Sequence, residues 1–258
     1  MTKKVALITG ASKGLGKALA EALSKHYTIY AGVRDTSKAP EGTLPIHLDL
    51  TKEETLTQAV DHIIIHHQKI DLLIHNAGVC YVGPVDSFTP QEVQHQFQVN
   101  FFGPLQLTQL ILPHMRKQKS GKILFISSIR AVDSGPYIGV YSASKAALEA
   151  AALDWAVTLS PWNISVSIFQ PGPINTGIEF KHGTHFETSP YPPLKNFSLD
   201  LQSTPDVCKA ILDQLNNPTP PFIAQSNSST TKEAQKILKD STGNTHLNAE
   251  KSWFKDYT

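Results

Sequence analysis

The sequence predicts a single α/β domain built on a doubly wound, mostly parallel sheet of about seven strands. Three observations support this prediction: short apolar runs alternate with helix-length stretches, the first run leads into a glycine-rich turn, and polar motifs follow several of the runs. Crossovers between parallel strands are right-handed and leave ligand crevices at the carboxyl ends of the strands. Residues that follow strands are therefore the first candidates for a functional site.

The strands and helices are expected to alternate along most of the chain. Buried strands are predicted at residues 5–8, 28–33, 46–48, 72–74, 123–126, 166–169 and 221–224. Helices are predicted at residues 15–26, 53–67, 99–116, 139–159 and 205–215. This strand-helix rhythm is typical of the doubly wound nucleotide-binding architecture known as the Rossmann fold.

Length and composition fit one domain over residues 1–258. The chain has 40% hydrophobic and 17% charged residues, which is enough apolar content to bury a full core. Its 23 basic and 22 acidic side chains nearly balance, so nucleic acid is not expected as a partner. Two distant cysteines, Cys80 and Cys208, fit reduced structural thiols in the cytoplasm. No apolar run is long enough for an export signal or a membrane span.

Three segments are expected to have special roles. Residues 175–203 contain several aromatics among Gly and Pro and are too long for a tight connection, so they are predicted to form a substrate lid. Residues from Ser226 onward are expected to be a polar tail. The stretch 139–159 is rich in alanine and allows close approach of a neighbour, through either packing or dimerisation.

The first strand leads into a glycine-rich turn that can bind phosphate. Glycines in such a turn bring backbone amides to the beginning of a helix, where the helix dipole favours an anion. A glycine turn alone is a weak signal, but its place between a strand and a helix is the context that a dinucleotide site requires. The predicted cofactor residues here are Gly10, Ser12, Lys13, Gly14, Leu15 and Gly16.

Two basic residues indicate NADP(H) rather than NAD(H). Arg34 ends the second strand, where NAD enzymes place an acidic residue on the adenosine ribose. Its guanidinium can bind a 2′-phosphate in a forked geometry, and Lys13 can add a second positive charge. The alternative is that both are ordinary solvated surface charges, and the neighbouring Asp35 weakens the phosphate interpretation.

Two further motifs follow strands at the same predicted edge. They are the pair Asp49-Leu50 and the triplet Asn76-Ala77-Gly78. Either can line a bound adenosine, although Asp and Asn-x-Gly clusters also occur in ordinary turns.

The clearest candidates for chemistry are Ser128, Tyr141 and Lys145. Tyr141 and Lys145 are at i and i+4 and share one helix face. A phenol with its usual pKa near 10 is a poor base, and a neighbouring ammonium lowers that pKa. Ser128 can hydrogen-bond a substrate oxygen, and Asn100 can complete a proton relay through water. A tyrosine one turn before a lysine is common on its own, so this pair gains meaning only from its setting.

Taken together, these motifs resemble the classical short-chain dehydrogenase/reductase family. The glycine turn, Asn76-Ala77-Gly78, Asn100, Ser128, the Tyr141 to Lys145 motif and Pro171-Gly172 occur in the family's order, and the resemblance covers about residues 3–224. It implies a catalytic tetrad of Asn100, Ser128, Tyr141 and Lys145, with Lys145 also on the nicotinamide ribose. It further implies that the nicotinamide contacts Pro171, Gly172, Ile174 and Thr176. His75 departs from the family's usual Asn, which puts one minor contact in doubt.

The resemblance implies an NADP(H)-dependent oxidoreductase that moves hydride between the nicotinamide and a carbonyl or secondary alcohol. The expected substrate is a small apolar molecule, and the expected assembly is a homodimer or homotetramer. Within the family, the chain is similar to steroid and retinol dehydrogenases. Two alternatives stay open: a ketoreductase of the 3-oxoacyl-acyl-carrier-protein type, and a non-catalytic NADP-binding sensor or scaffold. The physiological substrate and the reaction direction are not set by the sequence.

A metal site is not expected. His62, His66 and His67 lie close together on a predicted helix, and the i, i+4 pair has the spacing of metal ligands. No third ligand accompanies them, so a solvated helix face is the preferred interpretation.

Overall fold

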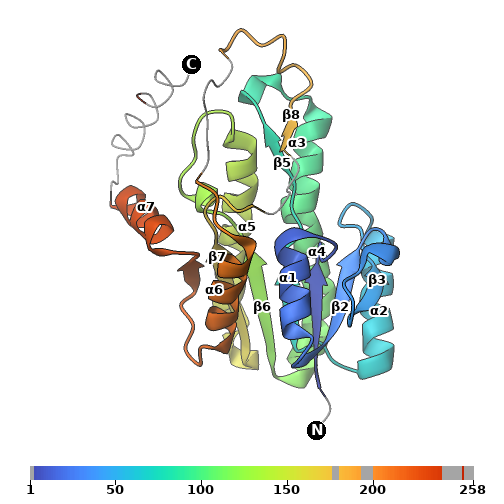
Figure 1. The fold of residues 1–258 in the computed structure, drawn as a ribbon. Coiled ribbons are helices and arrows are strands. Elements are labelled where there is room, and N and C mark those ends of the chain that lie inside the picture. The colour runs from blue at the N-terminus through green and yellow to red at the C-terminus, as the bar shows by residue number, and fades with distance from the viewer. Residues whose placement is uncertain (1–2, 176–179, 193–199, 240–251, 253–258) are drawn as a thin grey trace.

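A parallel sheet forms the centre of the molecule, with helices on both faces (Figure 1). The computed structural model describes residues 3–175, 180–192, 200–239 and 252. Within these residues a seven-stranded sheet has the order β3-β2-β1-β4-β6-β7-β9. Its strands are β1 (Lys4–Thr9), β2 (Tyr27–Val33), β3 (Leu44–His47), β4 (Leu72–His75), β6 (Gly121–Ile126), β7 (Ile164–Gln170) and β9 (Ile223–Gln225). All the pairings are parallel, which confirms the predicted doubly wound fold.

Alternation along the strands places apolar side chains on both faces of the sheet. In β1, Val5 and Leu7 belong to one core cluster, whereas Ala6 and Ile8 belong to the other. The first cluster is covered by α2 (Glu53–His67), α4 (Gly103–Gln118) and α5 (Gly139–Thr158). The second is covered by α1 (Gly14–Leu23) and α6 (Thr204–Asn216). Strands buried on both faces explain why they read as continuous apolar runs.

The helical segment predicted at 99–116 begins earlier in the sequence than expected. It is preceded by α3 (Pro90–Phe97) and a π-helical turn, η3 (Gln98–Phe102), which runs directly into α4. Thr89 caps α3, because its hydroxyl accepts from the Glu92 amide while the Glu92 carboxylate accepts from the Thr89 amide. The Thr-Pro-Gln-Glu pattern of this capping box is visible in the sequence, but the prediction did not use it.

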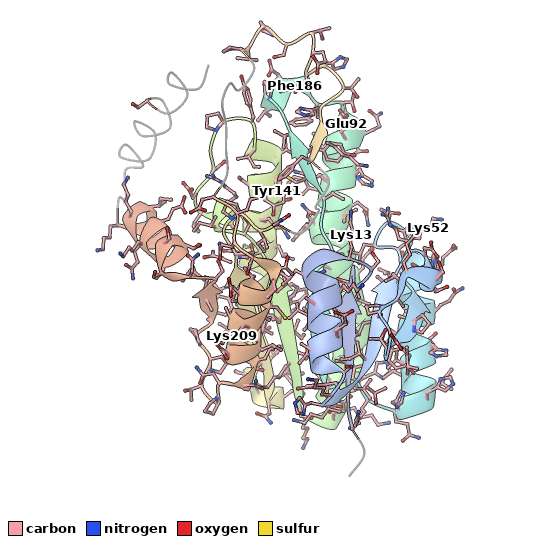
Figure 2. All side chains as sticks on the ribbon, viewed as in Figure 1. Lys13, Lys52, Glu92, Tyr141, Phe186 and Lys209 are labelled. Carbon is pink, nitrogen blue, oxygen red and sulfur yellow. The ribbon has the colours of Figure 1, made fainter. Side chains whose placement is uncertain are left out.

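A second, two-stranded parallel sheet lies beyond the carboxyl edge of the main sheet. It pairs β5 (Cys80–Val82) with β8 (Phe180–His182), which belongs to the segment predicted as a lid. Glu92 also accepts from the backbone amide and hydroxyl of Thr184, at 3.0 and 2.9 Å, so this segment is tied to α3. Figure 2 shows Glu92 and Phe186 on the far side of Tyr141 from the main sheet. Residues 176–179 and 193–199 of the predicted lid lie outside the described residues.

The predicted tail from Ser226 contains a helix in its described part. Asn227 caps the helix α7 (Ser228–Leu238) by accepting from the Thr230 amide at 2.8 Å, and Thr230 and Ala234 are buried. Most of the chain beyond α7 lies outside the described residues. Short 3-10 turns complete the structure: η1 (Thr36–Lys38), η2 (Val85–Ser87), η4 (Ile129–Ala131) and η5 (Ser160–Trp162).

The sequence also predicts the state of the cysteines and the absence of a membrane span. Both cysteines are free and buried, as structural thiols would be. Among the described helices, none is both long enough and apolar enough to cross a bilayer.

Candidate active site

The glycine turn between β1 and α1 is held in a tight conformation. Gly10 has a φ of +67°, and a Cβ there would lie 2.9 Å from the Ala77 Cα. A Cβ on Gly16 would lie 2.4 Å from the Gly10 carbonyl oxygen, so a larger residue would push the turn apart. Both positions therefore require glycine for backbone contact, which is what a close-fitting phosphate turn needs.

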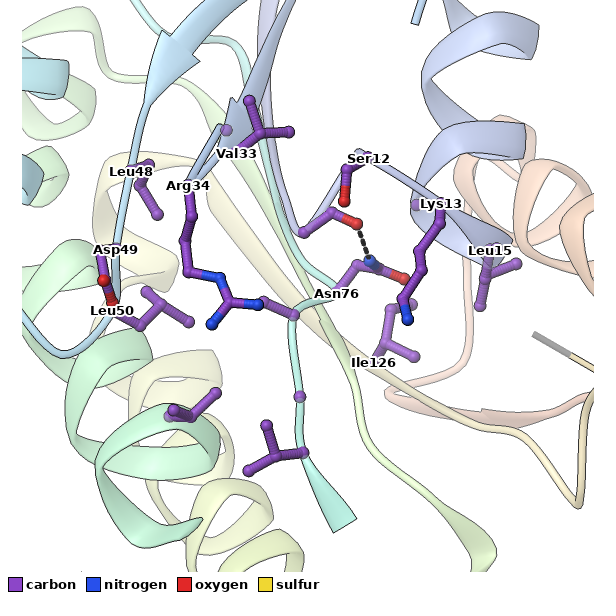
Figure 3. Close-up of a pocket in the computed structure, with 18 of the residues that line it drawn as sticks. Ser12, Lys13, Leu15, Val33, Arg34, Leu48, Asp49, Leu50, Asn76 and Ile126 are labelled. Atoms are coloured by element: carbon purple, nitrogen blue, oxygen red, sulfur yellow. Dashed lines mark hydrogen bonds between the residues drawn. The ribbon is translucent and has the colours of Figure 1, made fainter. Parts of the chain in front are cut away.

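Asn76 fixes this turn to the end of β4. Its amide nitrogen donates to the carbonyls of Thr9 and Gly10, at 3.0 and 3.2 Å. In the other direction the backbone amides of Asn76 and Ala77 donate to the Thr9 hydroxyl, at 3.0 and 3.1 Å. Figure 3 shows the Asn76 side chain reaching towards the turn. Asn76 thus has a positioning role here, because its amide is committed to the protein backbone.

The turn opens into one elongated cavity along the carboxyl edge of the sheet. Most of the residues predicted to bind the cofactor line it: Gly10, Ser12, Lys13, Gly14, Leu15, Gly16, Arg34, Asp49, Leu50, Asn76, Ala77, Gly78, Tyr141, Lys145, Pro171 and Ile174. Gly172 packs instead against Gln202 and Thr230, since a Cβ there would lie 2.6 and 2.9 Å from their side-chain atoms. Thr176 lies outside the described residues. The lining fits an extended dinucleotide, with backbone amides at one end and Tyr141 at the other.

Arg34 and Lys13 approach the same part of the cavity from opposite sides. Figure 3 shows both side chains directed into it, Arg34 from the end of β2 and Lys13 from the beginning of α1. Asp35 is turned away into η1, where its carboxylate accepts from the Ser37 amide and hydroxyl and pairs with Lys38 at 3.4 Å. The acidic neighbour that weakened the phosphate interpretation is therefore engaged in its own turn.

Sequence reasoning missed several residues of the cavity wall. They are Gly32, Val33, Leu48, Thr51, Val79, His95, Val99, Ile126 and Ser127. His95 and Val99 are one helical turn apart before Asn100, so their spacing could have indicated a shared face. Burial, together with the positive charges of Lys181 and Arg34, lowers the pKa of His95. Asp49 has a lowered pKa, because hydrogen bonds from Thr51 and nearby positive charges outweigh its burial.

Tyr141 and Lys145 lie one turn apart on α5, where the cavity meets the end of β6. The Lys145 side chain is 4% exposed, and its ammonium donates to the Ile126 carbonyl at 2.9 Å. Its Nζ atom is 5.9 Å from the centre of the Tyr141 ring. The predicted pair therefore shares one wall of the cavity, as the i, i+4 spacing requires.

Burial has the largest effect on the pKa values of Tyr141 and Lys145. It raises the pKa of the Tyr141 phenol, with a further rise from Cys80, while Ser128 and Arg130 oppose the rise. It lowers the pKa of Lys145 to about 8, against the influence of Glu149 and Cys80. The sequence predicted a phenol pKa lowered by the ammonium, but in the structure burial raises it, and the opposing influences come from Ser128 and Arg130. A protonated Tyr141 is the form that can donate a proton to a carbonyl oxygen.

Ser128 and Asn100 are held by the elements around Tyr141. Ser128 caps η4, accepts from the Arg130 amide at 3.1 Å and influences the pKa of the Tyr141 phenol as a hydrogen-bonding neighbour. The Asn100 side chain is fully buried: it accepts from the Val79 amide at 2.9 Å and donates to the Val79 carbonyl and the Ser144 hydroxyl. The Asn100 amide is thus used to fix the chain after β4, so a relay through Asn100 would have to use its main chain.

The histidines on α2 contact the backbone of their own helix and a tyrosine of β2. The His66 ring donates to the His62 carbonyl at 2.7 Å, and the His67 ring lies 3.0 Å from the Tyr30 hydroxyl. His75 is buried at the end of β4, where its ring stacks on Phe125 and bonds the Thr108 hydroxyl at 2.8 Å.

Comparisons with known proteins identify the family. The sequence profile of the short chain dehydrogenases matches residues 4–185. A 3-ketodihydrosphingosine reductase from Bacteroides thetaiotaomicron is 40% identical over 69% of this chain, a match that spans 66% of that relative and leaves part of its length unmatched. Human retinol dehydrogenase 8 is 32% identical over 87% of this chain and 81% of its own length. Human 17-beta-hydroxysteroid dehydrogenase type 1 is 31% identical over 68% of this chain and 58% of its own length.

Solved structures agree with the sequence relatives. A short-chain dehydrogenase from Streptomyces avermitilis superimposes with a TM-score of 0.80 at 25% identity, covering 99% of this chain and 98% of the other. Another, from Burkholderia cenocepacia in complex with NADP, has a TM-score of 0.78 at 26% identity, covering 95% and 97%. The chain is therefore an oxidoreductase of the classical short-chain dehydrogenase/reductase family, with steroid and retinol dehydrogenases among its relatives.

Proposed function

We propose that this chain is an NADP(H)-dependent carbonyl reductase or alcohol dehydrogenase in which Tyr141 is the general acid and base. The observation that supports this most is the shared cavity: the glycine turn, Arg34 and the Tyr141-Lys145 wall all line it. A nucleotide sensor would need the first two features but not the third. When bound, the nicotinamide supplies or accepts the hydride.

In the direction of reduction, Tyr141 gives its phenolic proton to the carbonyl oxygen as the carbonyl carbon gains the hydride. Burial keeps the phenol protonated before this step, and the Lys145 ammonium faces the same ring and stabilises the phenolate that forms. Ser128 holds the substrate oxygen as a hydrogen-bond donor. In the direction of oxidation, the phenolate takes the alcohol proton back.

The relatives support an apolar substrate. Their names refer to a ketosphingoid, a retinoid and a steroid, all of which are largely hydrocarbon with one oxygen at the reacting carbon. The proposed lid, residues 175–203, contacts Tyr137 in its described part: the Tyr137 hydroxyl donates to the Pro192 carbonyl, and the centre of the Phe186 ring lies 6.1 Å from that of Tyr137, edge-on.

A substrate panel tests the proposed activity. The purified chain is mixed with NADPH and, separately, with long-chain ketones, retinal-like aldehydes, ketosteroids and acyl thioesters, and loss of NADPH absorbance is followed. We expect turnover with at least one apolar ketone or aldehyde. Turnover restricted to thioesters on an acyl carrier protein would support the ketoreductase alternative. NADPH binding without turnover on any carbonyl would favour the sensor.

The cofactor preference is tested at Arg34. The wild type is expected to bind NADPH more than tenfold tighter than NADH, a difference of about 1.4 kcal/mol or more. In Arg34→Leu this preference should fall several-fold with little change in NADH affinity, because the 2′-phosphate loses its forked partner and keeps only Lys13. Fluorescence titration with both cofactors measures it, with Arg116→Leu, which lies over the Trp162 ring away from the cavity, as the control. Equal affinity of the wild type for both cofactors would refute the NADP(H) proposal.

We also propose that α5 forms a contact between copies of this chain. Its exposed face carries Ala143, Ala146, Ala150, Leu153 and Val157, spaced three and four residues apart, and the last two are 53% and 67% exposed. Ala150→Arg should convert a dimer or tetramer to smaller species in size-exclusion chromatography with light scattering. Lys209→Glu, an exposed change on α6, should not. A wild type that is monomeric at all concentrations would contradict this assembly.

A further inference from the structure

A half-buried carboxylate, Glu149, lies behind the proposed catalytic pair. It is one helical turn beyond Lys145 on α5 and two turns beyond Tyr141, so the three side chains lie along one side of the helix. Both Glu149 oxygens accept from the amide nitrogen of Gln170, at 2.9 and 3.0 Å. A helix residue with only a structural role in this position could be apolar, so a charge held there requires a reason.

The orientation of Gln170 is fixed by a second amide. Gln170 is 1% exposed and ends β7, immediately before Pro171. Its carbonyl oxygen accepts from the Gln225 side chain of β9 at 2.8 Å. Because the oxygen is used there, the Gln170 nitrogen must face Glu149. An amide nitrogen directed at both carboxyl oxygens matches an ionised, acceptor-only carboxylate.

The other titratable neighbours of Lys145 are neutral at working pH. On β5, burial raises the pKa of the Cys80 thiol to about 12, and on β4 burial lowers the pKa of His75 to about 3. On α5 the Tyr141 phenol is protonated, since burial raises its pKa. Burial raises the pKa of Glu149 as well, while hydrogen bonds from neighbouring side chains and the charge of Lys145 oppose that rise and favour its carboxylate. Of the four titratable groups that face Lys145, Glu149 is therefore the one that supplies a negative charge. Burial alone would favour the neutral amine of Lys145, and Glu149 is the leading influence in the other direction.

We propose that Glu149 is a positioning residue that keeps Lys145 in its ammonium form, through a carboxylate held in place by Gln170 and Gln225. The inference rests on the proposed role of Lys145 beside Tyr141 and adds the group that maintains its charge. This arrangement also connects α5 to β7 and β9. The two strands lead into Pro171 and Ser226, and the Ser226 hydroxyl accepts from the Gly172 amide at 3.1 Å. Strand β9 thereby affects the charge at the active site without contacting the substrate.

The test compares wild type with Glu149→Gln. Glutamine keeps a hydrogen-bond acceptor for Gln170 at nearly the same size and removes the charge, so the fold is retained while the electrostatic effect is lost. The ammonium titration of Lys145 is followed by NMR on the isotope-labelled lysines of the full chain, with the signal assigned by its loss in Lys145→Met. We expect the Lys145 midpoint to fall by about one pH unit in Glu149→Gln. The alkaline limb of kcat/KM should move to lower pH by the same amount.

Two further variants make the comparison specific. Asp154→Asn removes an exposed negative charge from the same helix and should leave the Lys145 midpoint unchanged. Glu149→Asp keeps the charge but draws it back by one methylene, so its midpoint should lie between wild type and Glu149→Gln. If Glu149→Gln does not fold, as judged by its thermal unfolding, the shift in Glu149→Asp decides.

The outcomes separate this inference from the proposed function. An unchanged Lys145 midpoint in a folded Glu149→Gln overturns the role of Glu149, whether or not the chain turns over carbonyl substrates. An equal shift in Asp154→Asn overturns it as well, because the effect would then belong to the net charge of the helix. A lowered midpoint in a chain that reduces no carbonyl would support the coupling and count against the proposed function instead.

Discussion

Tyr141→Phe is expected to reduce turnover by roughly 10³-fold, because it removes the proton that must reach the carbonyl oxygen. NADPH affinity should stay close to that of wild type, since the ring remains on the cavity wall and the glycine turn is untouched. Steady-state rates and fluorescence titration of NADPH, measured on the same preparation, separate the two effects.

The control for this variant is another tyrosine that loses only its hydroxyl. Tyr27 is a half-buried residue at the beginning of β2, outside the cavity lining. Tyr27→Phe should keep both turnover and NADPH affinity. Wild-type turnover in Tyr141→Phe would mean that another group supplies the proton, and the assignment of Tyr141 would then be abandoned.

Lys145→Met is expected to lower turnover by about 10²-fold and to change the pH dependence. The pKa of Lys145 is lowered to about 8, so the group is charged below that pH and neutral above it. Wild-type kcat/KM should therefore fall as the pH rises through about 8. In Lys145→Met this limb should disappear, because no charge is left to lose. The pH profile of NADPH oxidation measures both.

Lys17→Met on the exposed side of α1 is the matched control for this change. It should retain the rate and the alkaline limb of wild type. A limb near pH 8 that persists in Lys145→Met would assign the titration to another group.

The main sheet was predictable because its strands are buried on both faces. Each predicted strand overlaps an observed one, and the helix predicted at 53–67 has the same ends as α2. Local sequence patterns did not predict β5 and β8, which are three residues each, with one buried residue in β5 and none in β8. Such short strands are defined by their pairing with each other, a contact between residues about a hundred positions apart that no local pattern contains.

The candidate site was predictable where a motif has a fixed backbone role. Gly10 and Gly16 are required by contacts within one or two elements, so their spacing between a strand and a helix was informative. His95 reaches the cavity because the capping box at Thr89 and Glu92 begins α3 early and sets the face of the helix. That orientation depends on the packing of α3 against the rest of the chain.

The pKa shifts of the site residues were the hardest property to predict from the sequence. Helical spacing correctly brings Lys145 beside Tyr141, but it carries no information on how deeply either is buried. Desolvation raises one pKa and lowers the other, and only the folded structure shows that it dominates. The same holds for Glu149, whose partners Gln170 and Gln225 come from strands far away in the sequence.

The most direct test of the central claim is to trace the hydride itself. NADPH that carries deuterium at the transferring position of the nicotinamide is incubated with the chain and the best carbonyl substrate of the panel, and the product is analysed by mass spectrometry and NMR. We predict that wild type places one deuterium on the carbinol carbon and that Tyr141→Phe, although it binds NADPH, does so at a rate roughly 10³-fold lower. Alcohol product without deuterium at that carbon, or equal transfer rates in the two proteins, would contradict the account.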